Sequence, residues 1–377
     1  MKYKIINRKK LLATIILDAM GRIIFSTFKR TQKKQFNVGE IKKILIIRTA
    51  YVGDVVMTLP ILKPLKDRFP SAEIDFVTAD NAAELLEGNP YIQNIHRFNA
   101  FWFYKSSLKE YFQFVRQLQK ENYDLVIEAR GDIRELLLIV SRLKSKMKLS
   151  YAFGGGAYLL THVVPFNGIK HRVEYHLDLV RYLGCKPNTL DWNIYLGHNE
   201  ISKIDRILTA NNIQGKFIAV HPGSRLPLKI WSPERYAQLC NRINRHFQLP
   251  ILILGASNEK ELADKIISGL NFVPTNLVAQ LSLRELAALL SKTRLFLCND
   301  SAPMHMAAAM KTATVAIFGP SKPEETKPYG NISRVVEKDF PCRRICDESN
   351  CKHISYQECM RAISVDDVFD AVNELLQ

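Results

Sequence analysis

Short apolar runs separated by helical patterns fill the chain from about residue 41 to residue 184. The run Ile44–Ile47 holds no polar side chain, which is typical of a strand buried on both faces of a parallel sheet. Further strands are predicted at Ile74–Thr78, near Ile92–Phe98 and at Leu125–Ile127. Helices are predicted from Asp54, from Ala82, over Lys105–Lys120 and over Arg134–Leu143. Strands that alternate with helices predict a doubly wound α/β domain.

The same alternation begins again after a polar stretch around Gly184–Glu200, which we interpret as a linker. Strands are predicted at Phe217–Val220, Ile251–Leu254, Leu295–Leu297 and Thr314–Phe318. Helices are predicted from Pro233, over Glu259–Ile267, over Leu286–Leu290 and over Pro303–Met310, the last capped by Ser301. We therefore expect an arm over residues 1–40, a Rossmann-like domain over 41–190 and a second over 191–377. Ligands of such sheets bind beyond the carboxyl ends of the strands, so we expect a central cleft between facing strand ends.

The arm carries an amphipathic helical pattern. Polar side chains recur every three or four residues, at Lys10, Thr14, Asp18, Arg22, Ser26 and Lys29, and a broad apolar face lies between them. The basic residues that flank this face suit an anionic membrane surface, and docking on the chain itself or on a partner is the alternative. The longest uncharged stretch, Leu11–Leu17, is too short to cross a bilayer, and Asp18 interrupts the apolar core that a signal peptide needs.

Charge is distributed unevenly along the 377 residues, whose formal net charge is +16. Residues 1–43 hold 12 basic and 2 acidic side chains, so the globular remainder carries only +6. Because the basicity belongs mainly to the arm, we expect no nucleic-acid partner for the globular body. The hydrophobic content of 47% is enough to give each of two domains a core.

Asp54 is a candidate catalytic residue because it follows the first strand, within the spacing Arg48-x5-Asp54. A carboxylate at the carboxyl end of a buried strand can take a proton from a bound hydroxyl group. An aspartate in the first turn of a helix is also common for structural reasons, since the helix dipole stabilises it. Position alone leaves both interpretations open.

Two loops of the second half can hold an anion. His221–Arg225, followed by Lys229, places a turn, the Ser224 hydroxyl and two cations after a strand, an arrangement that suits a diphosphate. A merely solvated basic loop is the alternative. Asn299–His305 also follows a strand and opens a helix, so that Ser301 and the first N–H groups would meet a phosphate. His305, one turn further, is either a ligand contact or a core histidine.

The sequence gives little support to a metal site. No Asp-x-Asp pair occurs, so a divalent cation lacks its usual carboxylate clamp for a nucleotide diphosphate. Four cysteines form C-x3-C-x4-C-x7-C around His353, without the paired C-x2-C spacing of a strong zinc motif: Cys342, Cys346, Cys351 and Cys359. We expect structural thiols or facultative disulfides there, with no metal and no cofactor. Neither half contains G-x-G-x-x-G or a Walker loop, which argues against dinucleotide dehydrogenases and P-loop NTPases.

Four motifs follow one another in a recognisable order. They are Ile44–Arg48 with Gly53–Pro60; His221–Arg225 with Lys229, Trp231 and Pro233; Asn299–Ala309; and Phe318–Pro320 with Pro328–Gly330. Together they resemble glycosyltransferase family 9, the heptosyltransferase family of lipopolysaccharide core assembly. Cys359-Met360 and a closing helix over Val365–Leu376 extend the resemblance to about residues 42–377, so that only the arm lies outside it.

The resemblance implies a GT-B architecture and an inverting, metal-independent sugar transfer. Asp54 matches the family's proposed catalytic base. The donor-binding residues that we expect, from the resemblance and from the basic loop, are Ser224, Arg225, Lys229, Glu259, Asp300, Ser301, Ala302 and His305. Among these, Glu259 matches a residue that faces the nucleoside ribose, and Ala302 stands where glycine is frequent in the family.

The reaction implied is transfer of heptose from ADP-heptose to a lipopolysaccharide core or a related glycolipid. We expect it in the cytoplasm, at the inner face of the cytoplasmic membrane. A family-9 transferase that uses another nucleotide-sugar, for example a UDP-linked one, is the first alternative. A sugar-nucleotide epimerase shares the architecture, but the motifs do not resemble it. A non-catalytic membrane-bound binding protein is the remaining alternative, against which Asp54 and Lys229 argue.

Overall fold

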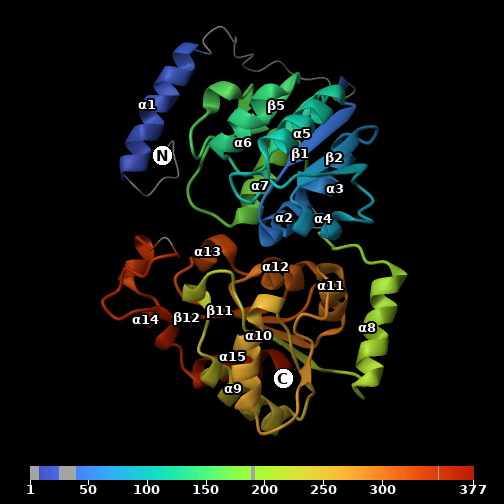
Figure 1. Ribbon diagram of the computed structural model, residues 1–377, viewed down its shortest axis with the longest axis vertical. Helices are drawn as coiled ribbons and strands as arrows, with labels where there is room; N and C mark the ends of the chain where they lie inside the picture. The colour runs from blue at the N-terminus through green and yellow to red at the C-terminus, as the bar shows by residue number, and fades with distance from the viewer. Residues whose placement is uncertain (1–7, 25–39, 188–191, 347) are drawn as a thin grey trace. The chain divides into compact units, whose positions relative to one another are not determined.

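The computed structural model describes residues 8–24, 40–187, 192–346 and 348–377. These residues form two compact units, the first ending at Trp192 and the second beginning at Asn193. Each unit is built around its own parallel sheet (Figure 1).

The sheet of the first unit has six parallel strands in the order β3-β2-β1-β4-β5-β6. The strands are β1 (Lys43–Ile47), β2 (Glu73–Thr78), β3 (Asn94–Arg97), β4 (Leu125–Glu128), β5 (Met147–Ser150) and β6 (His162–Val163). The order reverses beside β1, because β2 pairs on one of its edges and β4 on the other. Ligands of open α/β sheets bind at such a reversal, beyond the carboxyl ends of the two central strands.

Helices connect these strands: α2 (Val52–Thr58), α3 (Leu62–Arg68), α4 (Asp80–Ala83), α5 (Leu108–Lys120), α6 (Ile133–Leu138) and α7 (Arg172–Tyr182). Helix α5 begins at a capping box in which the Ser107 hydroxyl accepts the Glu110 N–H at 3.2 Å. Its Phe114 and Leu118 pack with Leu45 and Val126 of the central strands. This packing holds α5 against β1 and β4.

The sheet of the second unit repeats the same winding, in the order β12-β11-β10-β7-β8-β9. Its strands are β7 (Ile218–His221), β8 (Ile251–Ile253), β9 (Thr275–Asn276), β10 (Leu295–Asn299), β11 (Thr314–Phe318) and β12 (Ser333–Glu337). The reversal lies between β7 and β10, where Val220 is opposite Leu297. The predicted site loops follow directly after these two strands.

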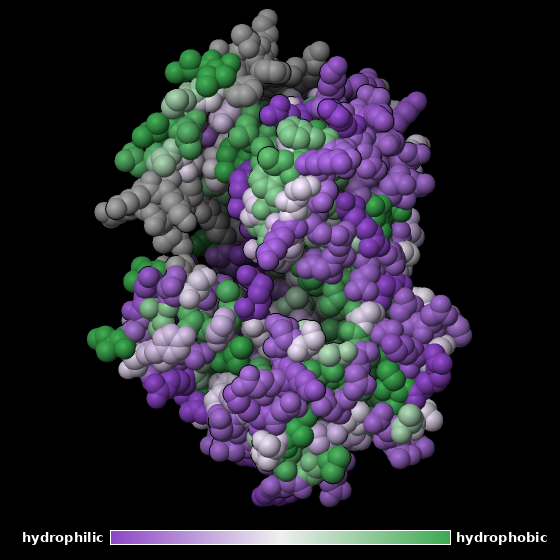
Figure 2. Space-filling view, viewed as in Figure 1, coloured by the Kyte–Doolittle hydropathy of each residue, from purple (hydrophilic) through white to green (hydrophobic). Residues whose placement is uncertain are grey.

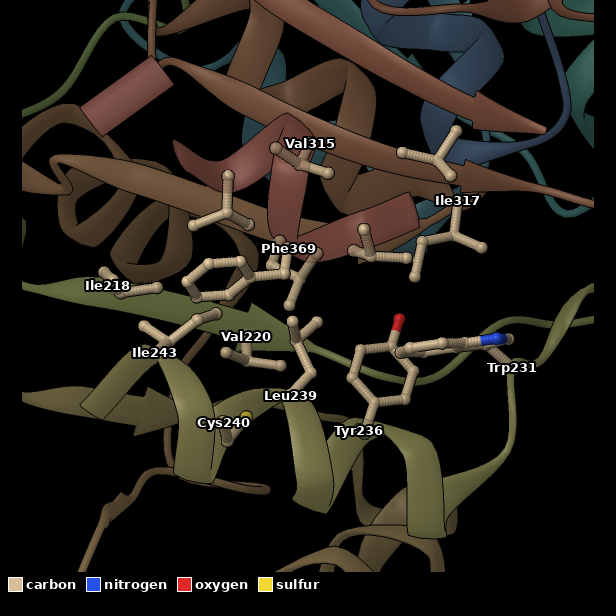
Figure 3. Packing of buried hydrophobic residues seen from close by; sticks show 14 of the residues in the cluster. Ile218, Val220, Trp231, Tyr236, Leu239, Cys240, Ile243, Val315, Ile317 and Phe369 are labelled. Atoms are coloured by element: carbon tan, nitrogen blue, oxygen red, sulfur yellow. The ribbon is translucent and has the colours of Figure 1, made fainter. Parts of the chain in front are cut away.

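The helices of the second unit are α8 (His198–Ala210), α9 (Pro233–Phe247), α10 (Lys260–Ser268), α11 (Leu283–Lys292), α12 (Ala302–Ala309), α13 (Pro323–Thr326), α14 (Glu358–Arg361) and α15 (Val365–Leu376). Figure 3 shows Leu239 and Ile243 of α9 beside Val220 of β7, with Phe369 of α15 in the same core. The Trp231 indole N–H donates to the Ile363 carbonyl at 3.1 Å. The chain after β7 is therefore tied to the start of α15.

Helix α1 (Arg8–Ile24) lies on the first unit through its polar side. Asp18 is 3% exposed, and its Oδ1 accepts the Gly156 N–H at 2.7 Å. Gly21 meets the ring of Tyr158 so closely that an added Cβ would lie 2.2 Å from it. Seven large apolar residues of the helix are 45–75% exposed: Leu12, Ile15, Ile16, Leu17, Met20, Ile23 and Ile24. The predicted continuation to Lys29 falls outside the described residues.

One predicted helix ends earlier than expected, and a further helix was not predicted. The helix expected over Arg134–Leu143 ends at Leu138 and continues as a 3-10 turn over Val140–Arg142. The Tyr111 hydroxyl donates to the Leu138 carbonyl at 2.7 Å, and the Arg142 N–H bonds to Ile139 instead. Helix α8 was not predicted, and it begins inside the stretch that we expected to be a linker. Residues 188–191 of that stretch lie outside the described residues.

Candidate active site

In the first unit, Asp54 lies in the first turn of α2, immediately beyond β1. Its Oδ1 is 2.8 Å from Nη2 of Arg48 and 3.5 Å from Nη1 of Arg172. Arg48 is almost fully buried, so its side chain is held by the sheet rather than by solvent. The Tyr51 N–H also donates to Oδ2 of Asp54 at 3.5 Å, so Asp54 helps to stabilise the start of α2 as well.

Electrostatics keep Asp54 ionised. Burial by itself would raise the pKa of this carboxyl, but Arg48 and Arg172, with Arg130 further away, hold the pKa well below its usual range. His176 lies beside this group and is neutral at pH 7, because burial and Arg48 lower its pKa to about 4. Its Nδ1 is 2.8 Å from the Met57 carbonyl of α2, so it joins α7 to the helix that carries Asp54.

The arginines around Asp54 outnumber its single negative charge. Arg130 follows β4, and its guanidinium lies 4.4 Å from the centre of the Phe103 ring. Arg134 lies at the same distance from that ring and pairs with Asp132 at 2.7 Å. The surroundings of Asp54 therefore suit a ligand that presents a hydroxyl group to the carboxylate and an anionic group to the arginines.

In the second unit, the loops beyond β7 and β10 open onto a cavity of about 310 Å³. Five of the predicted donor-binding residues line it: Ser224, Arg225, Glu259, Ser301 and Ala302. The opposite wall is apolar and comes from Leu277, Leu281, Leu283 and Leu286. The cavity thus combines a polar end with a hydrophobic wall, as a nucleotide requires.

Glu259 is fixed at one side of this cavity. Its Oε2 accepts the Ala256 N–H at 2.7 Å and lies 3.3 Å from Nε2 of His221. Burial would raise its pKa, but the His221 hydrogen bond and charge lower it below the usual range. Gly223 lies close beside it: an added Cβ would lie 1.8 Å from a Glu259 oxygen, so a larger residue here would displace the carboxylate. An ionised carboxylate in this place can accept hydrogen bonds from vicinal hydroxyl groups.

Ser301 stands at the N-cap of α12, as predicted, but its hydroxyl does not cap the helix. Pro303 occupies a position whose N–H an N-cap side chain commonly binds, and proline has no N–H to give. The Ser301 Oγ is buried and bonds to no group of the described residues. It is available to a ligand at the positive end of the helix dipole.

Lys229, Asp300 and His305 do not line the cavity. The Lys229 Nζ is 2.7 Å from Oδ2 of Asp300 and 2.8 Å from Oε2 of Glu348. These two carboxylates outweigh burial and raise the lysine pKa. The Ser224 hydroxyl donates to the Asp300 carbonyl at 3.1 Å, so the ion pair lies directly behind the cavity wall. His305 is buried in α12.

Sequence reasoning missed Glu348 and Arg172. Glu348 lies far along the chain from Lys229, in the cysteine-rich segment near the C-terminus, and no local pattern connects the two. Arg172 opens α7 and is 118 residues from Asp54. Only a motif that paired distant positions would have identified either residue.

The structure places no group of three or more His, Cys, Asp or Glu side chains to hold a metal ion, as far as its residues are described. The four cysteines of the predicted motif are free thiols and, with His353, line one small cavity beside Leu228. No helix in the described parts of the chain is long and apolar enough to span a membrane.

Comparisons with known proteins cover almost the whole chain. The model of "Glycosyltransferase family 9 (heptosyltransferase)" matches residues 111–354. Lipopolysaccharide heptosyltransferase 3 of Escherichia coli K12 is 28% identical, over 86% of this chain and 96% of its own length. The lipopolysaccharide core heptosyltransferase OpsX of Haemophilus influenzae is 24% identical, over 78% and 84%.

Solved structures show the same fold in both units. The family 9 glycosyltransferase of Veillonella parvula superposes with a TM-score of 0.77 at 20% identity, covering 90% of this chain and 98% of its own. E. coli ADP-heptose lipopolysaccharide heptosyltransferase II gives a TM-score of 0.71 at 22% identity, over 89% and 98%. The predicted fold of two Rossmann-like domains is confirmed, and the chain belongs to glycosyltransferase family 9 and is a glycosyltransferase of the GT-B fold.

Proposed function

We propose that this enzyme transfers heptose from ADP-heptose to a lipopolysaccharide core, with inversion at the anomeric carbon. The observation that carries the proposal is the cavity of the second unit, where a polar end meets an apolar wall. The named relatives, which include lipopolysaccharide heptosyltransferases of E. coli and H. influenzae, supply the sugar and the acceptor class.

The donor fits the cavity by its chemistry. The leucine wall suits a flat nucleobase, and the Glu259 carboxylate suits the two ribose hydroxyl groups. The diphosphate would lie at the polar end, where Arg225 carries a fixed charge and the Ser301 hydroxyl and the start of α12 provide donors. Lys229, held by Asp300 behind Ser224, adds a positive charge close to the phosphates.

The reaction requires one proton acceptor and a stabilised leaving group. Asp54 takes the proton of the acceptor hydroxyl, whose oxygen forms the new bond to the anomeric carbon. The bond from that carbon to the diphosphate oxygen breaks, and ADP leaves with the electron pair. Arg225, Lys229 and the helix end stabilise the charge that develops on ADP without having to reorganise.

The acceptor side is proposed from the charges at Asp54. Arg48, Arg130 and Arg172 together bring more positive charge to Asp54 than its carboxylate neutralises, although Arg130 also lies 3.6 Å from Asp132. An acceptor that carries phosphate or carboxylate groups near the reacting hydroxyl suits these surroundings.

We also propose that α1 holds the enzyme at the inner face of the cytoplasmic membrane. Figure 2 shows hydrophobic surface on α1, where the large apolar side chains are exposed. The helix is docked through Asp18 and Gly21, so its apolar face is left to meet lipid. The basic residues of the arm would add attraction to anionic headgroups.

A donor screen tests the proposed chemistry. Calorimetry with ADP, UDP and GDP, followed by transfer assays with ADP-heptose and heptose-deficient lipopolysaccharide core, should show ADP binding and heptosyl transfer that EDTA does not abolish. Tighter binding of UDP or GDP with no transfer from ADP-heptose would assign another donor. Loss of activity with EDTA would overturn the metal-independent mechanism.

A further inference from the structure

Three large apolar side chains form an exposed patch on the first unit that belongs neither to α1 nor to the proposed site. They are 37–61% exposed: Phe101, Leu108 and Phe112. The rings of Phe101 and Phe112 both contact the ring of Tyr111, at centroid distances of 5.8 and 5.0 Å. Leu108 and Phe112 are four residues apart in α5 and therefore lie on the same side of the helix. We call these three residues the α5 patch.

The α5 patch is held in place by the core beneath it. Tyr111 is buried, and its hydroxyl donates to the Leu138 carbonyl of α6 at 2.7 Å. On the opposite side of α5, Phe114 and Leu118 pack on the sheet. Because α5 is fixed on that side, it cannot turn to bury the patch, and exposed apolar surface of this kind marks a place where a partner binds.

Basic side chains surround the α5 patch. Residues 101–120 hold four basic side chains and one acidic one, all of them exposed: Lys105, Lys109, Arg116, Lys120 and Glu110. The Glu110 carboxylate is engaged locally, since its Oε2 accepts the Ser107 N–H at 3.3 Å. Apolar side chains flanked by an excess of cations suit an anionic lipid surface, where the acyl region takes the former and the headgroups attract the latter.

The loop that carries Phe101 also reaches the Asp54 site. Phe103, two residues further, lies 4.4 Å from the Arg130 guanidinium and 5.8 Å from the Tyr51 ring, measured to the ring centres. The Tyr51 N–H in turn donates to Asp54. A surface that touches Phe101 is therefore joined by one short loop to the place where we propose that the acceptor hydroxyl binds.

Helix α1 and the α5 patch flank the same layer of helices. Helices α5 and α6 and the 3-10 turn Ala157–Leu159 contribute side chains to one core cluster against the first sheet. Gly156, whose N–H binds Asp18 of α1, packs so closely on α6 that an added Cβ would lie 2.5 Å from Ile133. Figure 1 shows α6 between α1 and α5. The layer thus carries exposed apolar surface at both ends, on α1 and on the α5 patch.

We propose that the α5 patch is a second membrane contact, which binds an anionic lipid surface and turns the Asp54 site toward the membrane-embedded acceptor. The proposal rests on the proposed function, because a glycolipid acceptor gives such a contact its purpose. It adds orientation to anchoring. A single anchoring helix leaves the enzyme free to rotate about it, whereas two separate contacts determine which side of the first unit faces the bilayer.

A double substitution in the full chain, Leu108→Ser with Phe112→Ser, tests the α5 patch. Both side chains are more than half exposed, so the variant should fold. We expect binding to vesicles of phosphatidylcholine and phosphatidylglycerol to weaken about 5- to 30-fold, and transfer to a membrane-embedded acceptor to slow with it. Transfer to a detergent-soluble acceptor and the Kd for ADP should not change. Gln113→Ser with Gln117→Ser, two exposed positions of the same helix, is the control.

Two further variants report on the lipid contact itself. The emission of Phe112→Trp should shift to shorter wavelength on these vesicles, relative to the unmodified enzyme, and brominated phosphatidylcholine should quench the added signal. Lys105→Gln with Lys109→Gln should weaken binding to the anionic vesicles about 5-fold for each charge removed. The same variant should leave binding to vesicles of phosphatidylcholine alone unchanged.

The outcomes separate this proposal from the proposed function. Unchanged vesicle binding of the double Ser variant, or no added quenching in Phe112→Trp, would overturn the α5 patch as a lipid contact and leave α1 as the anchor. A dimer that becomes monomeric in the double Ser variant, with vesicle binding unchanged, would instead assign the patch to a contact between two copies of the chain. Failure to transfer heptose from ADP-heptose would refute the proposed function, and vesicle binding does not depend on that result.

Discussion

At the scale of single residues, Lys229 is a cation that two carboxylates neutralise while no donor is bound. Asp300 is nearly buried and lies behind it, whereas Glu348 is 36% exposed and contacts it from the C-terminal segment. A diphosphate that approaches Ser224 would compete with Glu348 for the lysine, while Asp300 would keep the lysine in place.

Substitutions on the two sides of Lys229 should have opposite effects on donor binding. Glu348→Gln should tighten ADP binding about 2- to 5-fold at low salt, because a partly exposed ion pair contributes little more than ~1 kcal/mol. Lys229→Ala should weaken ADP binding and turnover about 10-fold or more. Calorimetry measures both, with Glu324→Gln as the exposed control. Weaker binding in Glu348→Gln would mean that Glu348 supports the donor site rather than competing with it.

The sequence predicted those residues of the candidate site that lie next to a recognisable strand or loop. Asp54 follows the first strand by one loop, and Ser224 and Ser301 each follow a strand, so position and residue type made them candidates. The family resemblance then favoured the functional interpretation of Asp54. Arg172 and Glu348 depend on contacts between distant segments.

At the scale of elements, strands buried on both faces were predicted well. Apolar runs such as Ile44–Ile47 and Thr314–Phe318 lack the alternation of polar and apolar side chains that a surface helix or a half-exposed strand would show. Helix α8 was missed because only Ile204 and Leu208 are buried, which leaves a weak apolar signal within a polar stretch. Helix α1 was predicted, but the sequence could not predict which of its faces packs on the protein. That face is set by Asp18, which accepts a hydrogen bond from the backbone N–H of the distant Gly156.

From the exposed apolar face of α1 we predict that the arm is needed for membrane binding but not for folding. Deleting residues 1–36 should leave a folded enzyme that binds ADP normally but no longer sediments with anionic vesicles. Activity should persist on a detergent-soluble acceptor and fall on a membrane-embedded one. Each Lys or Arg lost near the surface costs ~1 kcal/mol of membrane affinity.

A second variant separates the contribution of apolar side chains to membrane binding from the contribution of charge. Ile16→Ser with Ile23→Ser keeps every basic residue and should still weaken vesicle binding, because both side chains are more than half exposed. Ser substitutions at Val273 and Ile332, two exposed apolar positions in the second unit, are the control. Aggregation of the truncated enzyme would show that α1 covers the protein itself, and the membrane proposal would then be wrong.

At the scale of the whole molecule, two units with the same strand order have different chemistry at equivalent places. Beyond β1 and β4 lie an ionised carboxylate and several arginines, and beyond β7 and β10 lie hydroxyl groups, a helix start and a basic loop. The repeated alternation of strands and helices made this fold predictable from sequence. The two units differ in their proposed roles because different side chains follow the two central strands of each sheet.

The most direct test is the rate of heptosyl transfer by Asp54→Asn. We expect turnover to fall ~10²–10⁴-fold with the Kd for ADP nearly unchanged, because Asn keeps the shape of the side chain but cannot accept the proton. Asp67→Asn, an exposed aspartate of the same unit, is the control and should retain full turnover. Near-normal turnover of Asp54→Asn on ADP-heptose and heptose-deficient core would contradict the assignment of Asp54 as the catalytic base.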